Sequence, residues 1–303
     1  VYVTGSNARF LSKDVVTTFR GRGDEVRVHP LSFAEYLSVQ QPLPFAEQHL
    51  NEYMRLGGLP QLVVMNSEQQ KRQYLSQLFA NTYLVDIKER YAIRNDDDLE
   101  ELIDVIASSI GSLTNPTKIA NTFASVKQSQ LSKDTIKRYL DYMQDAFMIE
   151  KAVRYDIKGR KYIDTPAKYY FEDLGLRNAR INFRQTEPTH LMENLIYNEL
   201  RVKGYSIDVG QVVTNTRNAN GVSERKQLEV DFVCNKADER IYIQSAYAMP
   251  TPEKQDQEIK SLKLINDSFQ KVVIAGGMQP TYRNNDGILI LNIYDFLLNK
   301  VTI

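Results

Sequence analysis

The most regularly patterned stretch of the chain is "LSKDTIKRYLDYMQDAFMIEKAVRYDIKGRKYIDTPAKYYFED", residues 131–173. Ser132 is a suitable N-cap for a helix. The apolar residues that follow it recur at helical spacing on one face, namely Ile136, Leu140, Met143 and Phe147. From residue 148 the pattern changes to two strands separated by a basic turn at Gly159. The stretch therefore predicts a helix followed by a β-hairpin.

A shorter helix is expected near residues 117–124, and the polar turn "SVKQSQL" separates it from the first. Two helices joined by a short turn and followed by a hairpin form a winged helix-turn-helix. Six cations lie in the first turns of the second helix and in the wing: Lys133, Lys137, Arg138, Lys158, Arg160 and Lys161. They predict contact with a phosphate backbone and little sequence specificity, with Gln128 or Gln130 as the candidate base-reading residues.

A second interpretation of these cations stays open. Charge runs usually mark a solvated helix face, and winged helices also serve as protein contacts. Three acids on the same helix dilute the basic patch: Asp134, Asp141 and Asp145.

The bulk composition is that of a folded protein with two or more domains. The chain has 303 residues, of which 42% are hydrophobic and 25% charged, and 38 Lys and Arg balance 38 Asp and Glu. No overall basic charge indicates nucleic acid, so such a site must be a local patch. The single cysteine, Cys234, excludes a disulfide framework and favours a reducing cytoplasm. No membrane span or signal peptide is visible, and the three histidines lack metal-ligand spacing.

Both ends of the chain have α/β patterns. Residues 1–4 read as a strand, a helix of about three turns follows, and Val26 and Val28 alternate with polar residues in a second strand that ends at Pro30. Ser32 and Glu35 form a capping box for the next helix. Helices are also expected near residues 44–56 and 67–85, with the breakers Gly57, Gly58 and Pro60 between them. After Pro188, helices and strands alternate to the C-terminus.

The order of these parts resembles a group of bacterial and archaeal ATPases of the AAA type. The residues that carry the resemblance are "TGSNAR", "GRGDEVRVHPLSFAEYL", "YMRLGGLPQLV", "MENLIYNELRVKGY" and "LEVDFV". The resemblance implies the end of a P-loop ATPase domain at residues 1–31, a helical lid at 32–95, a winged helix domain at 96–185 and a domain similar to PD-(D/E)xK nucleases at 186–303. The expected fold class is accordingly α/β plus α.

The resemblance also implies an ATPase site. Asn7 matches the polar sensor residue near the γ-phosphate, and Arg22, with Arg20 second, matches the arginine finger that acts on a neighbouring subunit's nucleotide. A homo-oligomer would follow from such a finger. The sequence contains no G-x-x-x-x-G-K-[ST] motif. We therefore expect the sequence to cover the part of a longer protein that follows the P-loop, with ATP and Mg²⁺ bound only in the full-length protein and no cofactor on this chain.

The nuclease resemblance is incomplete at its centre. Glu193, with Glu199 as an alternative, matches the helical acid, and Asp231 matches the first strand acid. The next strand should carry Glu-x-Lys but has Gln244 and Ala246 at these positions. Nuclease activity is therefore not expected, although Glu229 and Asp231 share a strand face and are weak candidates for metal binding. Asp231 could instead be a structural acid paired with a base such as Arg225 or Lys226.

Three functions remain open from the sequence. The first is a DNA-associated or regulatory AAA-type ATP-binding protein with a degenerate nuclease-like domain. The second is a non-catalytic module that binds nucleic acid or protein. The third is a metal-dependent nuclease whose catalytic residues have migrated to other positions.

Overall fold

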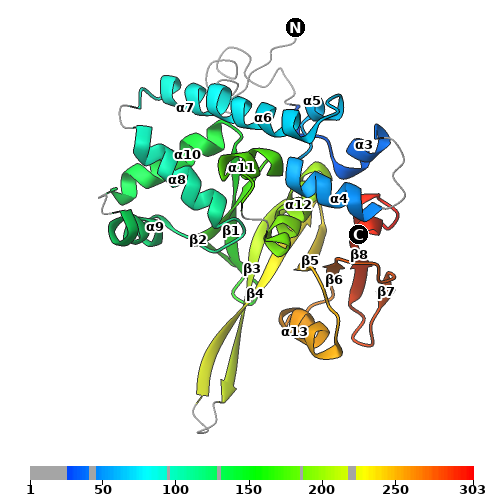
Figure 1. Ribbon diagram of the computed structural model, residues 1–303. Helices are drawn as coiled ribbons and strands as arrows, with labels where there is room; N and C mark the ends of the chain where they lie inside the picture. The colour runs from blue at the N-terminus through cyan, green and yellow to red at the C-terminus, as the bar shows by residue number, and fades with distance from the viewer. Residues whose placement is uncertain (1–25, 41–45, 94–95, 128–130, 185–186, 218–222) are drawn as a thin grey trace, which may run out of the picture.

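The computed structural model of the protein describes residues 26–40, 46–93, 96–127, 131–184, 187–217 and 223–303. Its centre is a mixed eight-stranded sheet of order β2-β1-β3-β4-β5-β6-β8-β7 (Figure 1). The strands are β1 Ile149–Asp156, β2 Lys161–Phe171, β3 Ser206–Arg217, β4 Ser223–Lys236, β5 Glu239–Ala246, β6 Gln270–Ala275, β7 Tyr282–Arg283 and β8 Leu289–Asn292.

Most of the helices precede the first strand in the chain, and the others connect or follow the strands. Those before the first strand are α3 Phe33–Ser38, α4 Ala46–Leu56, α5 Pro60–Val63, α6 Glu68–Leu78, the π-helix η2 Phe79–Leu84, α7 Val85–Arg90, α8 Asp96–Ser108, α9 Pro116–Thr122, the π-helix η3 Phe123–Lys127 and α10 Lys133–Asp145. The later ones are α11 Leu174–Arg180, α12 Pro188–Val202, α13 Pro252–Lys263 and α14 Ile293–Leu297. No helix within the described ranges combines the length and hydropathy needed to cross a membrane.

The strand predicted around Val26 and Val28 is wrong within the described residues. Residues 26–31 form neither strand nor helix, and the two valines are 83% and 89% exposed. The alternation is real, but its charged members face the body. Arg27 forms an ion pair with Glu150 at 2.5 Å and a second one with Glu172. The segment is therefore anchored by charge, and no described strand pairs with it.

The first helices confirm the local signals of the sequence with two adjustments. The capping box of Ser32 and Glu35 is present at the start of α3. Pro60, expected only as a breaker, occupies the first turn of α5, where a proline costs no hydrogen bond. The helix expected at residues 67–85 continues through η2 and α7 to Arg90.

The stretch at residues 131–173 forms a helix and a hairpin as predicted. Ser132 Oγ accepts a hydrogen bond from Thr135 N at the start of α10, and Ile136, Leu140 and Met143 are buried. Phe147, expected on the same helix face, lies beyond the helix end with φ 53°. A bridge between Thr114 and Ala167 connects the segment between α8 and α9 to β2.

The hairpin is joined to the C-terminal strands in one sheet. β1 pairs in parallel with β3 through Arg154↔Val209 and Asp156↔Gln211. The sheet therefore crosses the boundary predicted between residues 185 and 186. β3 and β4 pair as far as Arg217↔Ser223 and project from the body as an arm (Figure 1).

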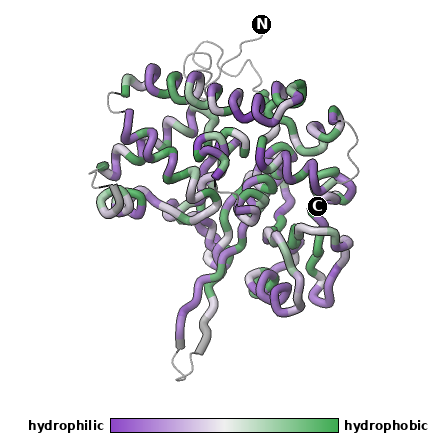
Figure 2. Tube along the Cα trace, viewed as in Figure 1, coloured by the Kyte–Doolittle hydropathy of each residue, from purple (hydrophilic) through white to green (hydrophobic). Residues whose placement is uncertain are grey.

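Two apolar cores lie on opposite faces of the sheet. Strand residues such as Val209 and Phe232 belong to the core that includes α12 and α14, and Val230 and Val273 belong to the core that includes α13. α13 connects β5 to β6, which are parallel neighbours and need such a crossover. Figure 2 shows that green and purple residues alternate along the helices, as expected when each helix buries one face.

Candidate functional site

A buried cluster of charges lies where β2, β4 and α12 meet. Lys168 of β2 is only 3% exposed. Its Nζ lies 2.8 Å from Glu193 Oε1, 2.7 Å from Glu229 Oε1 and 3.7 Å from Asp231 Oδ1. Three carboxylates from two elements thus surround one ammonium group.

The backbone periodicities explain this convergence. Glu229 and Asp231 are two residues apart on β4 and therefore face the same side of the sheet. Lys168 and Tyr170 have the same relation on β2, and Tyr170 donates its hydroxyl hydrogen to Glu193 Oε1 at 2.7 Å. Tyr170 also stacks on Tyr197, one turn along α12 from Glu193, with ring centroids 4.2 Å apart.

The remaining oxygen of Asp231 is held by β5. Asp231 Oδ2 accepts hydrogen bonds from Gln244 Nε2 and from Ser245 N, both at 2.8 Å. Gln244 therefore presents its amide nitrogen to the cluster, and its Oε1 accepts a 3.4 Å hydrogen bond from Ser261 of α13. Ala246 is buried in the core under α13.

Burial and mutual repulsion control the protonation of this cluster. Burial raises the pKa of Asp231, the negative charge of Glu193 raises it further, and Lys168 opposes the shift. Burial disfavours the charged form of Lys168, but the three carboxylates outweigh this effect and raise its pKa. Burial also raises the pKa of Tyr170. The surrounding carboxylates therefore favour the charged form of Lys168.

The structure brings together four of the residues singled out from the predicted resemblance to nucleases, Glu193, Glu229, Asp231 and Gln244. Glu199, the alternative helical acid, lies elsewhere and accepts a hydrogen bond from Phe33 N. The basic partner of the acids is Lys168, whereas Arg225 and Lys226 are exposed on the arm. In the part of the chain that the structure describes, no group of three or more His, Cys, Asp or Glu side chains is arranged to hold a metal ion.

The sequence did contain a signal for Lys168. It stands alone in "AKYYF", an apolar strand end where a lysine is unexpected unless it is paired. Its carboxylate partners lie 25 or more residues later in the chain, so pattern and spacing could not connect them.

The other predicted site residues fall into two groups. Asn7, Arg20, Arg22, Gln128 and Gln130 lie outside the described residues. The six predicted nucleic-acid contacts are all exposed, and they lie on α10, in the β1–β2 turn and at the start of β2: Lys133, Lys137, Arg138, Lys158, Arg160 and Lys161.

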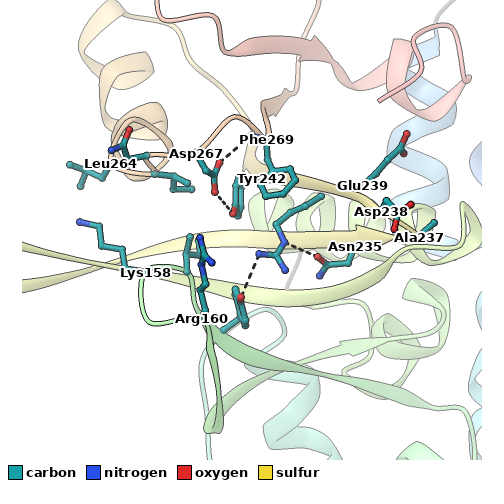
Figure 3. Close-up of a pocket in the computed structure, with 15 residues that line it drawn as sticks. Lys158, Arg160, Asn235, Ala237, Asp238, Glu239, Tyr242, Leu264, Asp267 and Phe269 are labelled. Atoms are coloured by element: carbon teal, nitrogen blue, oxygen red, sulfur yellow. Dashed lines mark hydrogen bonds between the residues drawn. The ribbon is translucent and has the colours of Figure 1, made fainter.

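A cavity of about 810 Å³ opens beside the β1–β2 turn. Its walls are the β1–β2 turn, the β4–β5 turn and the loop between α13 and β6 (Figure 3). Lys158 and Arg160 of the predicted wing line it, together with Arg240 of β5. The guanidinium of Arg240 lies between two rings, 5.1 Å from that of Tyr155 and 5.6 Å from that of Phe269.

Comparison with known proteins places the chain in a family. An "Uncharacterized protein" of Haemophilus influenzae is 35% identical over 301 residues, which cover 98% of this chain and 70% of that protein. The chain belongs to the same family as this protein. "Uncharacterized protein MJ1544" of Methanocaldococcus jannaschii is 27% identical over 300 residues, covering 90% of this chain and 65% of that protein. The chain thus spans about two thirds of the length of these family members.

Two domain families match separate parts of the chain. Residues 1–37 match an AAA domain, and residues 47–187 match a domain of unknown function (DUF8612). Among solved structures, "Crystal structure of protein VC1899 from Vibrio cholerae" aligns at 13% identity with a TM-score of 0.26 over 92% of this chain and 63% of that chain, a likeness too low to indicate a shared fold.

Hydrogen bonds, several of them to buried acids, connect the end of the segment that matches the AAA domain to the rest of the chain. Phe33 N donates to Glu199 Oε1 at 2.6 Å, and Leu31 N donates to the carbonyl of Gly58 at 2.8 Å. Asp173 accepts from Gly58 N at 2.8 Å and from Leu176 N at 2.9 Å. Burial raises the pKa of Glu199 to about 7 and that of Asp173 to about 6. The "PLSF" and "GGLP" stretches therefore form a structural junction.

Proposed function

We propose that the chain is part of an AAA-type ATP-binding protein whose described residues form a nucleic-acid-associated module with a non-cleaving, nuclease-like centre. The match of residues 1–37 to an AAA domain and the greater length of its relatives support the ATP-binding half of this proposal. In this account Asn7 senses the γ-phosphate, and Arg22 or Arg20 acts on a neighbouring subunit's nucleotide. In this account the full-length protein carries the phosphate-binding loop.

The observation that supports a non-cleaving centre is the position of Lys168 among the acids. A nuclease of the type that this centre resembles needs Mg²⁺ or a similar ion on carboxylate oxygens. An ammonium group already lies within 2.8 Å of both Glu193 and Glu229. Gln244 directs a hydrogen-bond donor at Asp231, and Ala246 has no group that activates water. The cluster is therefore suited to hold β2, β4 and α12 together.

The exposed cations support association with nucleic acid. A helix with a basic first turn and a basic hairpin turn can neutralise phosphates on a duplex, with an affinity that falls as salt rises. A non-catalytic module that binds a protein through the same face is the alternative. We expect reversal of the charges of Arg160 and Lys161 to weaken duplex binding at every sequence, and this tests the nucleic-acid partner.

The test uses the full-length gene product. We expect it to bind a fluorescent ATP analogue and to leave plasmid and linear DNA intact in Mg²⁺ or Mn²⁺. Loss of nucleotide binding in an Arg22→Ala variant is not expected, since a finger acts on its neighbour, but loss of ATP hydrolysis is. Absence of nucleotide binding by the full-length protein would overturn the AAA assignment.

A metal-dependent nuclease is a second candidate, because Lys168 can also be viewed as a catalytic lysine that has migrated to β2. Cleavage that requires Mg²⁺ or Mn²⁺ and disappears in both Asp231→Ala and Lys168→Met would establish it. Lys300→Met changes an exposed lysine that belongs neither to the cluster nor to the six predicted nucleic-acid contacts, so it is the matched control and should retain any such cleavage.

A further inference from the structure

We propose that the cavity beside the β1–β2 turn binds an unpaired nucleotide of a nucleic-acid strand, with its base against the exposed ring of Phe269 and its phosphate on Lys158 and Arg160. This inference rests on the proposed association with nucleic acid and adds the class of strand. The volume of the cavity, about 810 Å³, is within the range of roughly 300–1,000 Å³ that is typical of small-molecule sites.

The aromatic wall is suited to a planar ligand. Phe269 is 40% exposed, and its ring packs edge-on against Tyr242 with centroids 6.4 Å apart. Arg240 Nε donates to Asn235 Oδ1 at 2.8 Å, which holds the guanidinium between the rings of Tyr155 and Phe269. Arg240 thus supports Phe269 from one side, and an exposed aromatic ring is a group on which an unpaired base stacks.

Cationic side chains extend from the cavity to the arm formed by β3 and β4. Lys158 and Arg160 are exposed and line the cavity, as Figure 3 shows. Lys158 Nζ also donates to the carbonyl of Val213 at 3.0 Å, which fixes the β1–β2 turn against the base of the arm. Lys226 is exposed on β4 opposite Thr214, the residue after Val213. A strand with its phosphates on these side chains could reach the cavity with one base.

Acidic residues limit the electrostatic share of binding. Asp238, Glu239 and Asp267 line the cavity against Lys158, Arg160 and Arg240, three acids to three bases. Asp267 is already engaged, because it accepts hydrogen bonds from Tyr242 at 2.7 Å and from Phe269 N at 3.2 Å. Stacking must therefore provide most of the selectivity. A duplex cannot provide it because its base faces are covered, so the site favours an unpaired nucleotide.

Fluorescence anisotropy on the full-length protein tests this inference with a blunt duplex and the same duplex bearing a four-nucleotide overhang. We expect the overhang to tighten binding by at least roughly 5-fold, the lower end of the contribution of one stacked base. Phe269→Ala should remove that preference without changing the affinity for the blunt duplex, and Phe269→Tyr should retain it. Tyr282→Ala removes a ring that is 39% exposed outside the cavity and is the matched control.

The outcomes separate this inference from the function on which it rests. Equal binding of the two duplexes by the wild type, or a preference unaffected by Phe269→Ala, overturns the nucleotide site and leaves duplex association intact. Competition by free AMP at the concentration at which the overhang competes overturns the assignment to a strand. No binding of either duplex overturns both proposals.

Discussion

Replacing Lys168 by methionine should destabilise the protein strongly and in a pH-dependent way. Methionine keeps the length and apolar stem of the side chain but removes the ammonium that lies 2.8 Å from Glu193 and 2.7 Å from Glu229. Glu193 and Asp231 are both 7% exposed and would keep buried charges without their cation. Removal of one partner from a buried ion pair costs about 3–5 kcal/mol, and we expect a loss of this size at pH 8.

The loss should shrink as the pH falls. Burial and Glu193 already raise the pKa of Asp231, and removal of Lys168 raises it further. Both folded proteins take up a proton on Asp231 as the pH falls, but the variant does so from a higher pH because its pKa is raised further. Its free energy of unfolding therefore rises more than that of wild type between pH 8 and pH 5.

Urea denaturation followed by circular dichroism at pH 5, 6.5 and 8 measures both effects. Lys161→Met, an exposed change on the same strand, should stay within about 0.5 kcal/mol of wild type at every pH. A Lys168→Met variant within about 1 kcal/mol of wild type at pH 8, or a deficit that does not change with pH, would refute the reasoning on the buried cluster.

Three further outcomes follow from the described contacts. Glu199→Gln should stabilise the protein against denaturation at pH 8 but not at pH 5. A carboxyl of raised pKa favours folding only while it is protonated, so wild type loses stability as the pH rises from about 4.5 to about 7, and the glutamine variant does not. Gly57→Ala should lower the melting temperature, since φ is +78° and a Cβ would lie 2.3 Å from Asp173 Oδ1; an unchanged melting temperature would argue against the junction. Arg160→Glu with Lys161→Glu should weaken duplex binding and flatten its salt dependence by about two phosphate contacts, and an unchanged salt slope in anisotropy titrations would count against a nucleic-acid partner.

Local signals predicted the elements well. Ser132 indicated the start of α10, Ser32 and Glu35 indicated the capping box of α3, and the apolar alternation indicated β4 and β5. Such signals depend on residues within one or two turns of each other, which a single sequence displays directly. α11 was not anticipated, although Asp173 caps it through a hydrogen bond from Leu176 N.

Long-range relations were harder to predict. The pairing of β1 with β3 joins residues more than 50 positions apart and merges two predicted domains into one sheet. The convergence of Glu193, Asp231 and Gln244 could be anticipated only through a family resemblance. Lys168 was missed because its contacts depend on how the β1–β2 hairpin joins β3 and β4 in one sheet. No spacing rule in the sequence encodes that arrangement.

The central claim is that Lys168 prevents Glu193, Glu229 and Asp231 from binding a metal ion. Its most direct test is a Mn²⁺ titration of the full-length protein, without nucleotide, followed by electron paramagnetic resonance of the free ion. The account predicts that wild type and Asp231→Ala take up equal amounts of Mn²⁺ at millimolar concentration, because the Lys168 ammonium occupies the space among the carboxylates. One additional Mn²⁺ bound by wild type and lost in Asp231→Ala would contradict it.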